Sequence, residues 1–231
     1  MKKQTLYTEL TYVIALVILA CGTALMEYGG FGISMVAAPG YVLHLKLFPI
    51  SSFFSFGTVG YLVEALILGV MMLLIRKARL IYLLSFVTAV LYGYALDGVS
   101  LLTAMLPENN LLLQIPLYLV GMLFCSAAVS LLLMGYFPPA AHEMFIKEIC
   151  RHFKLPLGKT KTLYDCVFLA LSIGLSLLFF GTIRGIGIGT VLCALVNGAT
   201  IRLLTSLWNK LFRFKDIFPL RSKFQESEEA L

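Results

Sequence analysis

Six long apolar stretches separated by short polar segments constrain this sequence more than any other feature. A helix needs roughly 20 apolar residues to cross the hydrocarbon core of a bilayer, and every backbone polar group in lipid must be satisfied internally. The stretches are residues 10–37, 53–75, 80–106, 111–137, 163–180 and 181–208. We therefore predict an all-α, polytopic membrane protein with six transmembrane helices in a single membrane domain covering residues 1–231.

Composition supports a membrane protein over a soluble one. Hydrophobic residues make up 60% of the chain and charged residues 13%, whereas soluble domains are about 45–50% apolar and about 25% charged. The first stretch contains Ile18-Leu19-Ala20-Cys21 after two lysines, which resembles a lipoprotein cleavage box. Because the apolar run continues beyond Cys21, we predict a first transmembrane helix rather than a cleaved signal.

The basic residues predict the orientation of the chain. If the N-terminus is cytoplasmic, fifteen Lys and Arg residues lie on the cytoplasmic side, Lys46 and Arg184 lie on the other side, and Arg202 lies within the last span. Cytoplasmic loops are enriched in Lys and Arg. We therefore expect a protein of the bacterial inner membrane with both termini, including a tail over residues 209–231, in the cytoplasm. The net charge of +6 then reflects topology, and we expect no nucleic-acid partner.

Two connectors contain polar residues. The first, residues 39–52, is amphiphilic, and the second, residues 140–162, is the only sizeable polar connector. In the second, apolar residues at 144, 145, 149 and 153 recur at helical spacing beside basic residues. This pattern predicts a basic amphipathic helix on the membrane surface, and the same connector is a candidate contact for a partner subunit.

The two halves of the chain, residues 8–106 and 111–208, can be aligned with a shift of 99 to 101 residues. Gly57 and Glu64 then fall on Gly158 and Asp165, and Asp97-Gly98 falls on Asn197-Gly198. Three spans per half is an odd number, so the second half would enter the membrane from the opposite side. This predicts two inverted-topology three-helix repeats, an arrangement in which substrate sites lie near the bilayer midplane between repeats. Short apolar matches also arise by chance, so a coincidental alignment is the alternative.

Four acidic residues lie within or at the ends of spans: Glu27, Glu64, Asp97 and Asp165. A charge in the bilayer is costly, so such residues usually face a cavity or a partner. They are the candidate substrate- or ion-binding residues, together with Asn197, which could hydrogen-bond between helices. If the acids share a cavity, one of them could carry a proton between the two faces. The alternatives are capping of a neighbouring helix or, for Asp165 near two lysines, a place at the interface.

A glycine-rich stretch from Gly181 to Gly198 opens the sixth span. If it is helical, Gly181, Gly185 and Gly189 lie on one face with Cys193 and Asn197. Small residues four apart allow close packing of helices in lipid. The G-x-G-x-G run inside it also resembles a phosphate-binding loop, but that motif requires a soluble strand-turn-helix context. We therefore predict a helix-packing face.

Catalytic and metal-binding motifs are absent from the sequence. The five cysteines form no C-x-x-C pair, and the three histidines form no metal-binding pattern. His142 and Glu143 with Cys150 and His152 make a weak cluster that charged connectors produce freely. We therefore expect no enzymatic activity, no cofactor and no bound metal.

Several segments resemble a known family. GFGISMVAAPGYVLHLKL, FSFGTVGYLVEAL, LLSFVTAVLYGYALDG, KTKTLYDCVFLALSIGLSLLFFG and GIGIGTVLCALVNGATI resemble the YczE/YyaS/YitT-type bacterial membrane proteins over nearly the whole chain. Many relatives have a Trp-Asp pair where this chain has Pro39-Gly40-Tyr41-Val42, so one expected acid is missing. The resemblance implies an uncharacterised integral membrane protein related to transporters, without a substrate or a site.

The sequence therefore favours a carrier or channel for a small polar solute or ion. The alternative is a non-transporting membrane module, either a substrate-binding subunit or a scaffold for a partner complex. Its partners would be the lipid bilayer and the solute, with a homo-oligomer or a partner subunit contacting residues 140–162.

Overall fold

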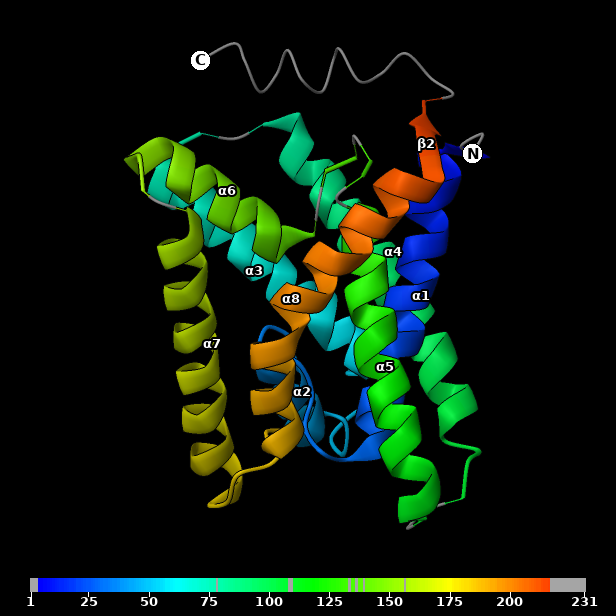
Figure 1. The fold of residues 1–231 in the computed structure, drawn as a ribbon. Helices are drawn as coiled ribbons and strands as arrows, with labels where there is room; N and C mark the ends of the chain where they lie inside the picture. The colour runs from blue at the N-terminus through cyan, green and yellow to red at the C-terminus, as the bar shows by residue number, and fades with distance from the viewer. Residues whose placement is uncertain are drawn as a thin grey trace.

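The computed structural model describes residues 4–77, 79–107, 110–132, 134–135, 137–138, 140–155 and 157–216, without the side chains of residues 4, 80, 157–159 and 161–162. Within these residues, six helices are long and apolar enough to cross a membrane, which confirms the predicted multi-pass helical fold (Figure 1). They are α1 (Thr8–Gly29), α3 (Phe56–Ile75), α4 (Leu80–Thr103), α5 (Leu111–Leu132), α7 (Leu157–Phe180) and α8 (Ile188–Leu211).

Two short helices occupy the predicted connectors. They are α2 (Ala38–Leu47) and α6 (Ala141–Phe153), of 10 and 13 residues. At 1.5 Å per residue they measure about 15 and 20 Å, so neither crosses the roughly 30 Å hydrocarbon core. In both helices the first residues are buried and the last are more exposed.

The predicted location of the helix at residues 140–162, on the membrane surface, is therefore wrong. Helix α6 forms at the expected residues, but it packs against α3, α4 and α7, and residues 157–162 already belong to α7. The cause is visible in the side chains: Ala141, Met144 and Ile149 are buried against α3 and α4. The apolar stripe that suggested a lipid surface instead faces neighbouring helices.

The two ends of the described chain pair with each other. Strand β1 (Gln4–Tyr7) lies parallel to β2 (Phe212–Lys215), with Gln4 opposite Phe212. The Thr8 hydroxyl donates a 2.8 Å hydrogen bond to Asp216 Oδ1 beside this pair. Both ends of the described chain therefore lie at one end of the bundle, while residues 1–3 and residues 217–231 of the predicted tail lie outside the described residues.

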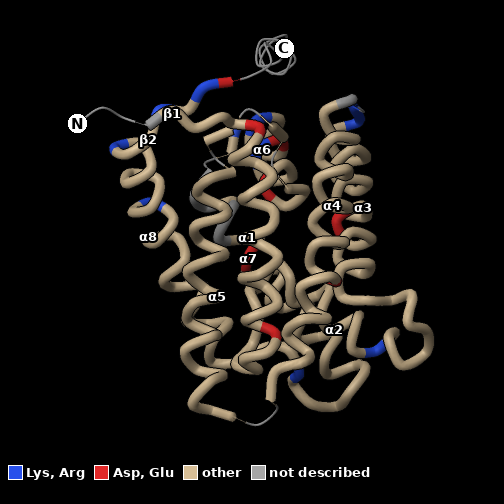
Figure 2. The backbone as a smooth tube through the Cα atoms, turned by 90° about the vertical axis from the view of Figure 1, so that its right-hand side faces the viewer, with Lys and Arg blue, Asp and Glu red and all other residues tan. Residues whose placement is uncertain are grey.

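The charges follow this polarity. Figure 2 shows the Lys and Arg positions gathered mainly at the end of the bundle that holds α6 and the strand pair. The opposite end holds α2 and has few of them. This agrees with the difference in charge between the two sides that the sequence predicts.

The centre of the bundle is the crossing of α1 and α5. A Cβ on Gly22 would lie 2.8 Å from the Gly121 carbonyl oxygen, and one on Gly121 would lie 2.7 Å from the Gly22 carbonyl oxygen. Two glycines therefore allow the two backbones to touch. Gly22 and Gly121 are aligned positions of the predicted repeat, so the two halves meet at corresponding residues.

The halves share an order of helices: long, short, long, long. Several pairings also correspond, since α1 packs on α4 as α5 packs on α8, and α3 packs on α6 as α2 packs on α7. One pairing differs: α3 and α4 pack closely, whereas α7 and α8, as described, do not pack along their lengths.

The glycine-rich stretch only partly forms the predicted helical face. Gly181 and Gly185 lie in the loop before α8 with φ of 66° and 73°, so the prediction that they pack on a helix face with Gly189 is wrong. The left-handed backbone that glycine tolerates is used here to turn the chain. Gly189, Cys193 and Asn197 do lie on α8, and the last span begins at Ile188 rather than at Gly181.

Candidate functional site

Glu64 lies near the middle of α3 at the N-terminus of α6. Its side chain is buried, and the Ala141 backbone N–H donates to its Oε2 at 3.4 Å. Helix N-termini carry a partial positive charge that favours an anion. The α6 N-terminus has no side-chain cap of its own on Ala140, so the Glu64 carboxyl supplies it from another helix.

The N-terminus of α2 approaches the same region from the opposite side. Val36, two residues before α2, packs against a buried cluster that includes Ile67 of α3 and Ile146 of α6. The two half-helices lie at opposite ends of the bundle (Figure 1). Their N-termini therefore converge near the middle of α3, and their C-termini point to opposite ends.

Polar side chains from α6 and α7 lie near Glu64. His142 Nδ1 and the Tyr164 hydroxyl are 2.7 Å apart and buried. Glu143 interacts electrostatically with Glu64, and Asp165 with Tyr164. We call Glu64, His142, Glu143, Tyr164 and Asp165 the Glu64 cluster. It joins three helices by groups that accept, donate or carry a proton.

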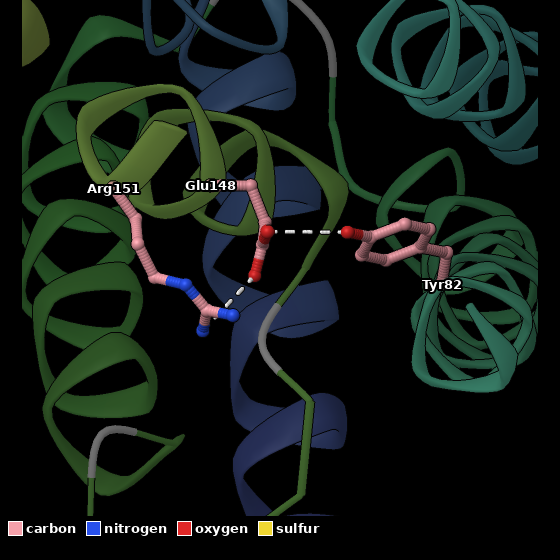
Figure 3. Close-up of polar contacts among 3 residues, drawn as sticks. All are labelled: Tyr82, Glu148 and Arg151. Carbon is pink, nitrogen blue, oxygen red and sulfur yellow. Dashed lines mark hydrogen bonds and ion pairs between the residues drawn. The ribbon is translucent and has the colours of Figure 1, made fainter. Parts of the chain in front are cut away.

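A second buried acid, Glu148, fixes the C-terminal half of α6. Figure 3 shows Glu148 between Tyr82 of α4 and Arg151. The Tyr82 hydroxyl donates to Glu148 Oε2 at 3.1 Å, and Arg151 lies 3.8 Å from Glu148 Oε1. This contact holds α6 against α4 and thereby sets where its N-terminus meets Glu64.

Asp97 has a capping role at the other end of the bundle. Its carboxyl accepts hydrogen bonds from the Ser55 hydroxyl and, at 2.7 Å, from the Gly57 backbone N–H. Ser55 is the N-cap of α3 and also accepts from Thr58 N. A Cβ on Gly57 would overlap the Gly93 carbonyl, so α3 and α4 touch here. Asp97 therefore caps α3, which is one of the alternatives that the sequence left open.

Glu27 lies close to Asp97 and accepts a 3.2 Å hydrogen bond from Ser100. Tyr41 of α2 also interacts electrostatically with Glu27. Tyr92 interacts with both Glu27 and Glu64. The acids thus include two pairs, Glu27 with Asp97 and Glu64 with Glu143, and Tyr92 interacts with one member of each pair.

Asn197 and Asp97, which the predicted repeat aligns, make different contacts. The Asn197 side-chain oxygen accepts a 2.7 Å hydrogen bond from the Ser126 hydroxyl of α5, whereas Asp97 accepts hydrogen bonds from Ser55 and Gly57 at the N-terminus of α3. Asn197 therefore does not share the capping contacts of Asp97, and the pairing of the two residues in the repeat stays a prediction.

The glycines at the N-terminus of α8 join two loops. Gly189 N donates to the Phe31 carbonyl at 2.9 Å, and Ile33 N donates to the Gly185 carbonyl at 3.2 Å. A Cβ on Gly32 would lie 2.5 Å from Gly187 N. These contacts hold the loop that leads into α2 against the loop that leads into α8.

Some of these residues carried a signal in the sequence and others did not. Ser55 directly precedes a helix, where N-cap residues are expected. His142 and Tyr164 are 22 residues apart, and no local pattern relates them. Among the described residues, no three His, Cys, Asp or Glu side chains gather as metal ligands; the weak 142–152 cluster is dispersed because His142 turns to Tyr164.

Comparison with known proteins places the chain in a family. No curated protein and no solved structure matches it. The profile described as "Family of unknown function (DUF6198)" matches residues 6–206. That range contains all six spans and both half-helices except for the end of α8. The six apolar helices are those of a multi-pass membrane protein. The chain therefore belongs to the DUF6198 family, whose function is unknown.

Proposed function

We propose that this protein is a carrier or channel for a small polar solute or ion, with its site at the Glu64 cluster. The observation that carries the proposal is the convergence of the α2 and α6 N-termini near the middle of α3. Half-helices whose N-termini meet near the midplane provide oriented dipoles where a solute must shed water. Burying an acid within the membrane is costly, so such residues usually mark a functional site.

The arrangement of the two halves supports the same proposal. Their shared helix order and corresponding pairings fit two inverted repeats, which secondary transporters commonly use. The close contact of α3 with α4 has no counterpart between α7 and α8. Two related halves in different conformations are what an alternating carrier requires, because exchanging the two conformations would open the site to the other side.

The second candidate is a membrane module that binds a solute without moving it. The half-helices and the Glu64 cluster would form a binding site in this case too. Both candidates include the resemblance to the YczE/YyaS/YitT-type proteins. Both also include a location in the inner membrane, with the two termini in the cytoplasm. Absence of enzymatic activity and of a cofactor is also part of the proposal.

Reconstitution of the purified protein in liposomes separates the two candidates. Currents on a solid-supported membrane would be recorded with Na⁺, K⁺, ammonium, zwitterionic amino acids and monocarboxylates, and proton movement would be followed with internal pyranine. We expect flux of at least one probe, and loss of most of it in Glu64→Gln. The matched control is Gly98→Ala, since Gly98 has nothing within 4 Å of its Cβ position.

The outcomes differ in what they reject. Binding of a probe without flux favours the binding subunit, and flux that is equal in Glu64→Gln and Gly98→Ala rejects the assigned site. The pH dependence of flux tests proton coupling in Glu64→Gln and Asp97→Asn. If the pH dependence is unchanged in both variants, these acids do not carry the proton.

A further inference from the structure

Four sulfur side chains from three helices lie in the same part of the core, beside the α1–α5 crossing. They belong to one buried cluster: Met26 of α1, Met122 and Cys125 of α5, and Cys193 of α8. All are less than one-tenth exposed. Cys125 Sγ lies 3.9 Å from Met26 Sδ. This group is separate from the Glu64 cluster and includes none of its residues.

The position of Cys193 follows from its neighbours on α8. One turn before it, Gly189 lies against the Tyr118 ring, and one turn after it, Asn197 binds Ser126. Both intervals are eight residues (197 − 189 on α8 and 126 − 118 on α5), so α5 and α8 run in parallel here. Cys193 is therefore opposite Met122, one turn from Cys125 on the same face of α5.

The Cys125 thiol donates a hydrogen bond to the Met26 thioether, and the distance between these two sulfurs also fits two ligands of one metal ion. A metal–sulfur bond is about 2.3 Å long, and two such ligands in a tetrahedron are about 3.8 Å apart. The value for Cys125 and Met26 is 3.9 Å. Thiolate and thioether sulfur together select soft ions such as Cu⁺, whereas carboxylate and imidazole, which suit harder ions, are absent from the four side chains.

The charge balance also favours a monovalent ion. Binding of Cu⁺ by one thiol forms one sulfur–copper bond and releases one proton. The product, with one thiolate and neutral sulfur ligands, has no net charge. Neutrality is important because an uncompensated charge in the bilayer core is costly.

One buried hydroxyl group near these sulfur side chains lacks a hydrogen-bond partner in the described part of the chain. Tyr118 Oη is buried and has no hydrogen-bond partner among the described residues. The tyrosine is 3% exposed and interacts electrostatically with both Cys125 and Cys193. Buried hydroxyls usually have a partner, so a polar or charged species bound beside these cysteines would account for it.

We propose that Met26, Met122, Cys125 and Cys193 form a site for a monovalent soft metal ion, with Cu⁺ as the natural ion and Ag⁺ as a probe. The site goes beyond the proposed solute site and does not depend on transport. Sulfur side chains also fill irregular gaps in cores without any ligand, and the test must separate this packing role from ligation.

The test is a titration of the detergent-purified protein with Cu⁺ under anaerobic reducing conditions, in competition with bicinchoninate. We expect one Cu⁺ per chain and a sulfur-only first shell at about 2.3 Å by X-ray absorption. Cys125→Ser and Met26→Leu should each weaken binding by more than about tenfold, since even changes behind the ligands cost 10–100-fold. Cys166→Ser is the matched control, because Cys166 is an exposed residue of α7.

Met26→Leu keeps the apolar volume, so its fold can be checked by size-exclusion profile and melting temperature. Loss of Cu⁺ binding in a folded Met26→Leu protein supports ligation by the thioether. Wild-type protein that does not compete with bicinchoninate overturns the site, as does equal loss in Cys166→Ser. Liposome flux does not enter this test, so the solute proposal can fail or hold independently.

Discussion

At the scale of single residues, the intramembrane acids divide by what they contact. Asp97 accepts hydrogen bonds from Ser55 and Gly57 at the start of α3. Glu64 also lies at a helix N-terminus, that of α6, where it accepts a 3.4 Å hydrogen bond from Ala141, but it lies near titratable groups of α6 and α7 as well. The sequence placed both in one class, because position within a span does not reveal which backbone lies opposite a side chain.

Asp97→Asn is expected to destabilise the fold. The amide is uncharged, so it weakens the charge-assisted bonds at the α3 N-terminus, and loss of a cap costs about 1–2 kcal/mol. Thermal unfolding in detergent, followed by tryptophan fluorescence or aggregation, measures the effect. Gly98→Ala, the next residue with open space at its Cβ position, should unfold like wild type. An Asp97→Asn protein that is as stable as wild type but has no flux would place Asp97 in the solute site instead.

At the scale of helices, the contacts of α6 decide the site. Its apolar stripe and its basic residues were both readable in the sequence. The direction of the stripe was not, since lipid and a neighbouring helix are equally apolar. Only the packing against α3, α4 and α7 identifies α6 as a half-helix directed toward Glu64.

The α1–α5 crossing is expected to tolerate no side chain at its closest point. In Gly22→Ala, the added methyl would lie 2.7 Å from Cys125 Sγ and 2.8 Å from the Gly121 carbonyl. The helices must separate, and overpacking of this kind costs about 1–3 kcal/mol. Melting temperatures compare it with Gly174→Ala on α7, which has nothing within 4 Å. Equal melting temperatures for the two variants would mean that α1 and α5 cross elsewhere.

At the scale of the whole molecule, the strand pair and the charge distribution define one end of the bundle. Both termini and α6 lie at this end. The turn between α3 and α4 lies there too, because α1 leaves this end and α3 returns to it. The loop between α2 and α3 lies at the other end.

We expect this end to face the cytoplasm by the positive-inside rule. Single cysteines at Lys77, in the α3–α4 turn, and at Ile50, which is 72% exposed in the α2–α3 loop, would report it in a Cys166→Ser background. The reagent is a maleimide that passes the outer layers of the cell but not the membrane that holds the protein. It should label Ile50→Cys in intact cells and Lys77→Cys only after lysis. The reverse pattern would invert the topology.

The sequence by itself determined the class of fold, the six spans and the difference in charge between the two ends. These properties are local: a run of about 20 apolar residues must become a helix in lipid because its backbone has no other partner, and charge counts need no knowledge of packing. The tertiary structure alone decided which acid caps a helix, where the half-helices point and which sulfurs meet. Those facts depend on contacts between residues tens to a hundred positions apart, such as Glu64 with Ala141 and Met26 with Cys125. In a membrane the apolar pattern does not specify them: small residues mark where helices approach closely, but not which helix is the partner.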